Sequence, residues 1–219
     1  MNLRAGIPGR RAIARCTKEE AAETRERLLD AALDVFHADG VARPSLTKVA
    51  EHAGLTRGAI YGHFENKADL FAALCDRTLL PAEALAEARD AGADDPLATL
   101  RAWCVTVLRD MVAHRDRRRL LEVIFHKCEM VEEAGGIWRR RQQSRQLGRS
   151  HVTELVRLAV AAGQLPAGTD VPFAGILVHD AVTGLLSQWL LDPEAYDLPA
   201  RAERSADAMV ALLLALPGG

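Results

Sequence analysis

The clearest pattern of apolar and polar positions lies in residues 45–67, which read SLTKVAEHAGLTRGAIYGHFENK. The first apolar residues of this stretch fall on one face of a short helix: Leu46, Val49, Ala50 and Ala53. Gly54 follows directly, where the end of a helix favours a residue that tolerates a positive φ. The pattern therefore predicts a short helix that ends at this glycine.

A second helix is expected after a tight turn. Thr56 is placed to cap it, and Leu55 and Ile60 are placed to pack across that cap. Ile60 and Phe64 fall on one side of the helix, which we expect to run from Thr56 to Phe64. The opposite side carries Arg57, Gly58, Tyr61 and Gly62. A small, basic and aromatic face of this kind fits the major groove of DNA.

The next helix begins immediately behind this one. Asn66 is placed as its cap, and Lys67 lies in its first turn, where free backbone N–H groups and an ammonium group favour a phosphate. An αα-hairpin without a role in DNA binding has the same spacing. Spacing alone leaves that alternative open.

The residues before this unit predict a longer supporting helix. Thr17 and Glu20 fit a capping box, and the helix is expected to end at Asp39–Gly40. Its apolar face comprises Leu28, Leu29, Ala32, Leu33 and Phe36. The segments are short and need one another for a core, so they predict a three-helix unit.

The chain from Pro96 onward shows helical spacing and no alternation with a period of two. One apolar stripe comprises Leu97, Leu100, Cys104, Val107, Leu108 and Met111. A second follows the charged turn RDRRR and comprises Leu120, Leu121, Ile124, Phe125 and Cys128. Gly135 and Gly136 suggest a break before a long helix over about Trp138–Ala162. The whole chain is thus predicted to be all-α.

The last two helices, expected over 172–191 and about 199–216, are unusually apolar. The first has an apolar face of Ile176, Leu177, Ala181, Leu185 and Trp189, and the second one of Met209, Leu212, Leu213 and Leu216. These faces predict a homodimer through the last two helices, with Gly184 and Ser187 permitting close approach. The alternative is that both helices only cover the core.

The first residues, 1–16, contain four arginines and no acid, with glycine and proline as helix breakers. We expect a flexible basic arm, which either follows DNA or is an idle tail. The predicted organisation is this arm, a helix-turn-helix DNA-binding domain over 17–66, and a larger ligand-binding and dimerisation domain over 67–219.

Composition narrows the picture. The 219 residues are 49% hydrophobic, enough for a real core, and the formal net charge of −2 argues against indiscriminate coating of nucleic acid. No apolar run approaches the roughly 18 residues that cross a bilayer, and no signal peptide is evident, so a cytoplasmic protein without membrane contact is predicted. The four cysteines lack paired spacing, which favours buried thiols and leaves a redox sensor as the alternative.

Sequence patterns of catalytic and metal sites do not occur. We find no nucleophile elbow, P-loop, dinucleotide fingerprint or zinc-protease motif, so no enzyme and no cofactor are expected. His126 and Cys128 are poorly spaced for one metal, and no ligand cluster follows them. The arginines at the start of the long helix, including Arg140 and Arg145, are more simply a solvated or salt-bridged face than an anion site.

Residues 17–75, above all TRGAIYGHFENKADLF, resemble the DNA-binding domain of the TetR family of transcriptional regulators. The resemblance implies that Arg57 and Gly58 approach base edges, and that Tyr61, His63 and Lys67 contact phosphates. The full set of DNA-contacting candidates is Ser45, Thr47, Thr56, Arg57, Gly58, Tyr61, Gly62, His63 and Lys67. One departure stands out, because the family usually has an aromatic residue where this chain has Gly62.

The motifs DPLATLR, RRRLLEVIFHKCEM, GQLP and GLLSQWLL resemble the C-terminal domain of AcrR-type repressors, which control multidrug efflux pumps. That branch encloses a large, mainly apolar drug pocket. By position, its lining would comprise Cys104, Val107, Leu121, Phe125, Val178 and Thr183. Such residues also fill any helical core, which is the simpler interpretation without the resemblance.

Together these inferences predict a dimeric repressor that binds a palindromic operator and is released by a small apolar or aromatic compound, and so controls an efflux pump operon. Ligand binding would displace the helix that starts at Lys67 and misplace both reading helices. The alternative is a constitutive or redox-responsive DNA-binding regulator without a drug-type inducer.

Overall fold

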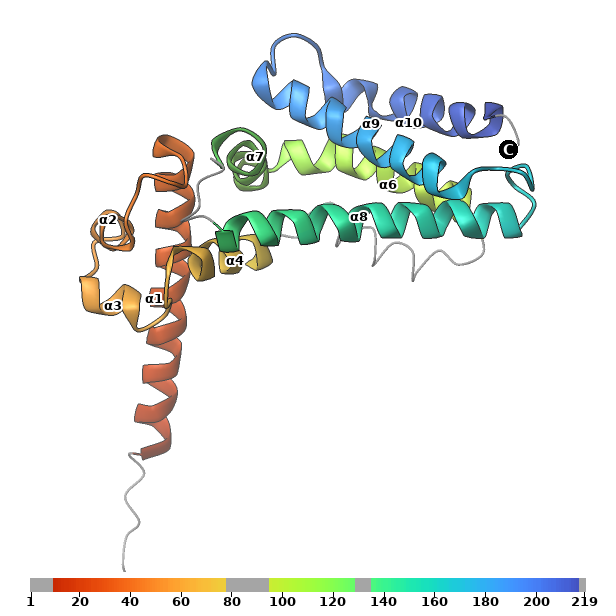
Figure 1. Cartoon of the computed structure of the whole chain (residues 1–219). Coiled ribbons are helices and arrows are strands. Elements are labelled where there is room, and N and C mark those ends of the chain that lie inside the picture. Colours follow the sequence, from red (N-terminus) through yellow and green to blue (C-terminus); the bar gives the residue numbers. More distant parts are fainter. Residues whose placement is uncertain (1–9, 78–94, 129–134, 217–219) are drawn as a thin grey trace, which may run out of the picture.

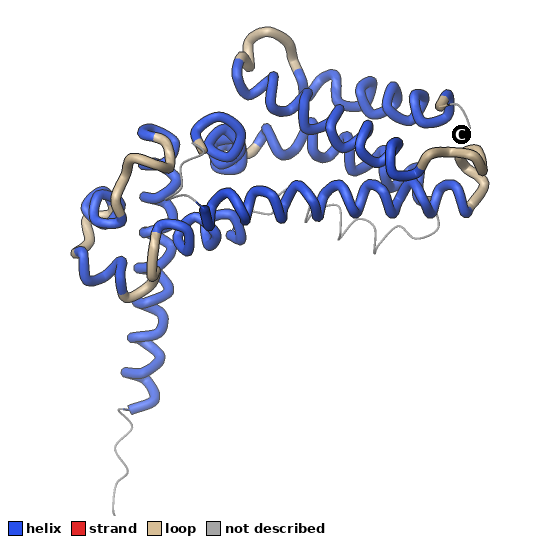
Figure 2. The backbone as a smooth tube through the Cα atoms, viewed as in Figure 1, coloured by secondary structure: helices blue, strands red, loops and turns tan. Residues whose placement is uncertain are grey.

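The computed structural model of the chain describes residues 10–77, 95–128 and 135–216. Every regular element in these ranges is helical, which confirms the all-α prediction (Figure 2). The elements are α1 (Arg10–Asp39), α2 (Leu46–His52), α3 (Arg57–Tyr61), α4 (Lys67–Arg77), α6 (Pro96–Ala113), α7 (Arg115–Glu122), the π-helical turn η1 (Val123–Lys127), α8 (Gly135–Ala161), α9 (Val171–Leu191) and α10 (Leu198–Ala215).

Helices α1, α2 and α3 form a small unit at one end of the molecule, and α4 leads from it toward the long helices (Figure 1). The predicted apolar face of α1 is fully buried there, with Leu28, Leu29 and Phe36 each 0% exposed. Gly40 and Gly54 adopt φ of 79° and 67°, as expected for the residues that follow α1 and α2. Local sequence signals therefore set the boundaries of this unit.

Helix α1 begins earlier than predicted. It starts at Arg10, so Thr17 lies inside the helix and does not cap it. The stretch RRAIARC contains good helix formers and no glycine or proline, and it extends the helix past the expected cap. Residues 10–16 of the expected flexible arm thus belong to α1, and residues 1–9 lie outside the described part of the chain.

The long C-terminal helices lie side by side, with α10 packed on α6 and α8 packed on α9 (Figure 1). Two boundaries differ from expectation. The RDRRR segment is not a turn but the first part of α7, because arginine is a good helix former and no breaker interrupts it. Helix α8 begins at Gly135, so the two glycines start the helix and do not precede it.

Helix α9 buries a different face from the one expected to be most apolar. Its inner face comprises Ala174, Val178, Val182, Leu186 and Trp189, all buried. Of the predicted face, Trp189 is buried, Leu177, Ala181 and Leu185 are half-buried, and Ile176 is 39% exposed. Two further apolar residues of α9, Phe173 and Leu191, are 51% and 60% exposed. On α10, Leu212 and Leu214 are 43% and 51% exposed. We call the exposed apolar side chains Phe173, Ile176, Leu191 and Leu212 the outer apolar face of α9 and α10. Leu214, two positions after Leu212, lies on the opposite side of α10.

Helix α9 also passes a length and composition test for a membrane-spanning helix, with a mean hydropathy of 1.2 over its most apolar window. The sequence still has no continuous apolar run of that length, because His179 and Asp180 interrupt it, but the average over the window tolerates them. Within the fold, 44% of this window is buried, and the core helix of a soluble protein passes the same test.

One close contact between α8 and α9 yields a stability test. A Cβ added at Gly175 would lie 2.2 Å from Thr153 Oγ1 and 2.9 Å from its backbone Cα. We expect Gly175→Ala to lower the free energy of unfolding by about 1–3 kcal/mol, because backbone must move to admit the methyl group. Chemical denaturation measures this value.

The control is Gly58→Ala in α3, where an added Cβ would lie 3.9 Å from Thr56 Oγ1, an ordinary van der Waals contact. Its free energy of unfolding should change by less than about 1 kcal/mol. Equal losses in the two variants would contradict the close α8–α9 packing.

Candidate DNA-reading surface and ligand pocket

Helix α3 presents the surface expected from its sequence. Ile60 and Phe64 are buried at 0% and 2% exposure, and Phe64 lies beneath the Arg25 guanidinium of α1, 5.5 Å from its ring centroid. On the outer side, Tyr61 is 49% exposed and the Arg57 guanidinium lies 5.4 Å from the Tyr61 ring centroid. The exposed side of α3 is thus a cation–aromatic pair flanked by exposed glycines.

The hydroxyl candidates lie at the N-termini of α2 and α3. Ser45 Oγ accepts the Lys48 N–H at 3.2 Å, and Thr56 Oγ1 accepts the Ala59 N–H at 3.2 Å. Both predicted caps are therefore confirmed, and each hydroxyl keeps its own proton as a donor. Thr47 is half-buried in the first turn of α2.

The end of α3 differs from the prediction. The helix stops at Tyr61, with Gly62 as its C-cap at φ −75° and ψ −18°, and does not continue to Phe64. Glycine disfavours a helix interior, which accounts for the early end. Because this φ is open to any residue, the backbone conformation itself does not demand a glycine here. The half-buried His63 ring packs beside Phe64, with ring centroids 6.3 Å apart.

Lys67 is engaged in a contact that the sequence did not reveal. Its half-buried ammonium group donates to the backbone carbonyls of Ala42 and Pro44, the latter at 3.0 Å. Lys67 thus ties the start of α4 to the loop before α2. Loop carbonyls leave no pattern in a sequence, so side-chain reasoning could not find this bond. The neighbouring cap is confirmed, since Asn66 Oδ1 accepts the Asp69 N–H at 2.9 Å.

A pocket lies between α4 and the C-terminal helices and contains about 790 Å³ of empty space, including the part open to solvent. Its lining comprises Phe71, Cys75, Trp103, Val107, Leu121, Ile124, Phe125, Arg140, Ser144, Arg145, Gly148, His179, Val182, Thr183 and Leu186. Four of the six predicted residues are among them. Cys104 and Val178 are not among them; both belong to the packed core, at 1% exposure each.

The polar groups at the pocket are few and partly engaged. Arg140 Nη2 donates to Asp76 Oδ1 at 2.8 Å, and His179 Nδ1 lies 2.9 Å from Asp180 Oδ1. Thr183 Oγ1 donates to the His179 carbonyl at 2.7 Å, so its proton is used within α9. The described residues contain no group of three or more side chains suited to a metal ion.

The cysteines bear on the redox alternative. Burial raises the pKa of the Cys104 thiol to about 12, so it stays protonated at neutral pH. Cys75 is also buried, although it lines the pocket. Reactive thiols need exposure and a lowered pKa. These two cysteines therefore lack the environment of a redox sensor.

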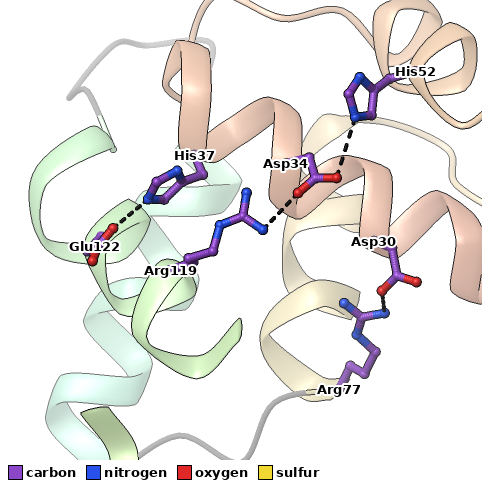
Figure 3. A network of polar contacts seen from close by, with 7 residues as sticks. All are labelled: Asp30, Asp34, His37, His52, Arg77, Arg119 and Glu122. Atoms are coloured by element: carbon purple, nitrogen blue, oxygen red, sulfur yellow. Dashed lines mark hydrogen bonds and ion pairs between the residues drawn. The ribbon is translucent and has the colours of Figure 1, made fainter. Parts of the chain in front are cut away.

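Polar contacts join the pocket side of the molecule to the DNA-reading unit (Figure 3). Arg119 of α7 pairs with Asp34 of α1 at 2.7 Å, and His52 of α2 lies 3.4 Å from the other Asp34 oxygen. Burial alone would raise the pKa of Asp34, but its bonds and attraction to Arg119 and His52 outweigh that effect and leave the pKa below its ordinary value. Nearby, His37 of α1 pairs with Glu122 of α7.

Helix α4 connects the same two regions. Phe71 lines the pocket and packs against Phe36 of α1, with ring centroids 6.3 Å apart. At the other end of α4, Arg77 pairs with Asp30 of α1 at 2.6 Å. A shift of α4 would therefore disturb contacts on both its pocket side and its α1 side.

Comparison with known proteins agrees with this geometry. Residues 28–74 match the profile described as bacterial regulatory proteins of the tetR family, and residues 95–215 match that of the C-terminal region of MAATS-type transcriptional repressors. The chain belongs to the TetR family. Its α2–α3 pair is accordingly the helix-turn-helix of a TetR-family transcriptional regulator, a class of proteins that are generally not enzymes.

Individual TetR-family relatives are similar over nearly the whole chain. AcrR of Shigella flexneri is 35% identical over 94% of this chain and 96% of the relative. The crystal structure of NalD, the secondary repressor of the MexAB-OprM multidrug efflux pump in Pseudomonas aeruginosa, is 31% identical over 90% of this chain and 98% of NalD, with a TM-score of 0.81. A complex of SmeT with triclosan is 29% identical over 90% of this chain and 96% of SmeT, with a TM-score of 0.78. The resemblance to AcrR-type repressors is thereby confirmed.

The Lys67 contacts predict an outcome different from that of a simple phosphate clamp. Lys67→Met should lower the free energy of unfolding by about 1–3 kcal/mol, because two loop carbonyls lose a charged donor. Operator affinity should fall while the salt dependence of binding stays the same. Thermal unfolding and anisotropy titrations at several salt concentrations measure both quantities.

A phosphate clamp predicts the reverse. If Lys67→Met unfolded like the unmodified protein but its salt slope fell by about one unit, the principal role of Lys67 would be a phosphate contact.

Proposed function

We propose that the protein is a dimeric, cytoplasmic repressor that binds a palindromic operator, controls an efflux pump operon, and is released when a small apolar or aromatic compound fills the pocket. The observation that carries this proposal is the position of Phe71 and Cys75. Both line the pocket, and both belong to α4, the helix that directly follows the helix-turn-helix. A ligand in the pocket therefore touches the element that positions the DNA-reading surface.

On the DNA side, the exposed face of α3 enters the major groove. Arg57 and the backbone at Gly58 approach base edges, and Tyr61 and His63 contact phosphates. Ser45, Thr47 and Thr56 add hydroxyl donors at the helix N-termini. Lys67 supports this surface indirectly, by holding the loop before α2 through its carbonyls. Gly62 leaves open the surface that an aromatic residue covers in most of the family. The two copies read half-sites about one helical turn, roughly 34 Å, apart or slightly more.

The proposed coupling runs through α4. A ligand that packs against Phe71 changes the contact of this ring with Phe36, and a shift of α4 also pulls on the loop that Lys67 holds. The α7 contacts to α1 give the unit a second support, through Arg119 and Asp34. Differential ligand binding to two α4 positions supplies the free energy for release.

The target operon is inferred from the relatives. NalD is named as a repressor of a multidrug efflux pump, and SmeT has been crystallised with triclosan. The predominantly apolar lining of the present pocket suits the same broad class of compound, with Val107, Leu121, Phe125 and Thr183 among the residues in contact. Because Cys75 and Cys104 are buried, we favour a ligand-responsive repressor over a redox-responsive regulator.

Binding to the DNA upstream of the gene tests the proposal. We expect the purified protein to bind a palindrome there, and we expect triclosan, as a probe, to weaken that binding about 5- to 150-fold.

A variant pair tests the reading helix. Arg57→Ala should relax base preference by about 1–3 kcal/mol at one base pair, while Arg115→Ala, at an exposed arginine of α7, should leave operator binding unchanged. Anisotropy titrations with operator and single-base variants measure these effects.

Two outcomes would count against the proposal. Operator binding that no compound weakens would favour a constitutive regulator. Equal base preference in the Arg57→Ala variant and the unmodified protein would remove α3 as the reading helix.

The dimer interface yields a separate prediction. We place it on the outer apolar face of α9 and α10, where Phe173 and Leu212 stand exposed in the single chain. Leu212→Glu should produce a folded monomer that has lost most operator affinity, because a charge is buried at the interface. Leu147→Glu, at a leucine of α8 that is 40% exposed, serves as the control and should stay dimeric. Analytical ultracentrifugation measures the oligomeric state of both variants. A Leu212→Glu variant that stays dimeric would rule out this interface.

A further inference from the structure

Among the described residues that line the pocket, the charged side chains are both arginines. Arg140 and Arg145 line it from α8, and no aspartate or glutamate is among the described lining residues. The same face of α8 contributes Ser144 and Gly148, so the basic groups border a stretch of small side chains. An apolar pocket with a basic edge distinguishes between ligands by their charge.

The two guanidinium groups differ in their surroundings. Arg140 is held by Asp76 of α4 at 2.8 Å, and its side chain is 20% exposed. Arg145 is exposed, and among the described residues no carboxylate lies within ion-pair distance of it. Among the described residues, Asp76 pairs with Arg140 at this edge, and Arg145 adds a second positive charge.

The remaining polar groups do not offset that charge. His179 Nδ1 faces the Asp180 carboxylate, which also lies 3.7 Å from Arg149. A histidine ring is not an anion in either of its protonation states. The Thr183 proton is used by the His179 carbonyl. None of these groups offers an anion to a cationic ligand.

We propose that the pocket selects apolar aromatic molecules that carry a carboxylate, with the ring among Trp103, Val107 and Phe125 and the carboxylate at Arg145. This inference rests on the proposed function, in which the pocket is the sensor site. A guanidinium group binds a carboxylate through two parallel hydrogen bonds. A cationic ligand of the same shape meets repulsion from the same group.

Three ligands with one ring test the proposal on the full-length dimer. They are naphthalene-2-carboxylate, naphthalene-2-carboxamide and 2-(aminomethyl)naphthalene, and calorimetry at pH 7.5 gives their dissociation constants. The carboxylate should bind about 10-fold or more tightly than the amide, and the amine more weakly than the amide. Operator release should follow the same order of ligands.

A pair of arginine variants assigns the effect to one residue. Arg145→Gln should reduce the preference for the carboxylate over the amide to less than about 3-fold and leave the amide affinity nearly unchanged. Arg157→Gln is the control, because Arg157 lies on the same helix outside the pocket and pairs with Glu154 at 2.7 Å. Its preference for the carboxylate should equal that of the unmodified protein.

The possible failures are distinguishable. Equal binding of acid and amide, tighter binding of the amine, or an unchanged preference in Arg145→Gln would overturn the inference and leave the proposed function standing. Binding of triclosan without any binding of naphthalene-2-carboxylate would do the same. If none of the naphthalenes and not even triclosan bound or released the operator, the proposed function would fail together with the inference.

Discussion

The packing of Phe71 is the contact on which the rest of this structure depends. One side of the ring faces the pocket, and it packs on Phe36 of α1 at 6.3 Å between ring centroids. Phe36 and Phe71 are buried at 0% and 1% exposure, so the pair forms part of the core and cannot move independently of it. Closely packed interiors shift between discrete arrangements and do not deform gradually. A ligand that displaces Phe71 therefore has to displace α4.

The polar contacts around this core limit how far α1 can follow. Asp34 pairs with Arg119 of α7, and Asp30 pairs with Arg77 of α4, so α1 is bonded to both helices (Figure 3). The Asp34 and Asp30 side chains are 46% and 69% exposed, and pairs of this kind contribute little net stability. They are better suited to fixing the relative positions of helices than to holding the protein folded. The apolar packing supplies the stability, and the ion pairs fix how the helices are placed relative to one another.

Sequence reasoning predicted well wherever the signal was local. The caps Ser45, Thr56 and Asn66 follow from side-chain chemistry within a few residues, and all three are present in the structure. The buried and exposed sides of α3 follow from helical periodicity in the same way. The predicted start of α1 was wrong, because the residues before Thr17 favour a helix and extend it past a good capping sequence.

The pocket could be predicted only in part, because its lining is a tertiary property. A buried residue and a pocket residue on α6 have the same apolar character, so Cys104 and Val107 cannot be told apart without the neighbouring helices. Arg145 looked like part of a solvated face, and only the position of α8 places it at the pocket. The roles of all these residues in binding DNA or ligand stay predictions.

The proposed function requires that the pocket and the operator site are coupled, and coupling is reciprocal. The most direct test measures the dissociation constant of one pocket ligand for the free dimer and for the operator-bound dimer. We expect the operator to weaken ligand binding by the same factor by which the ligand weakens operator binding, about 5- to 150-fold. Equal ligand affinity in the two states would contradict it.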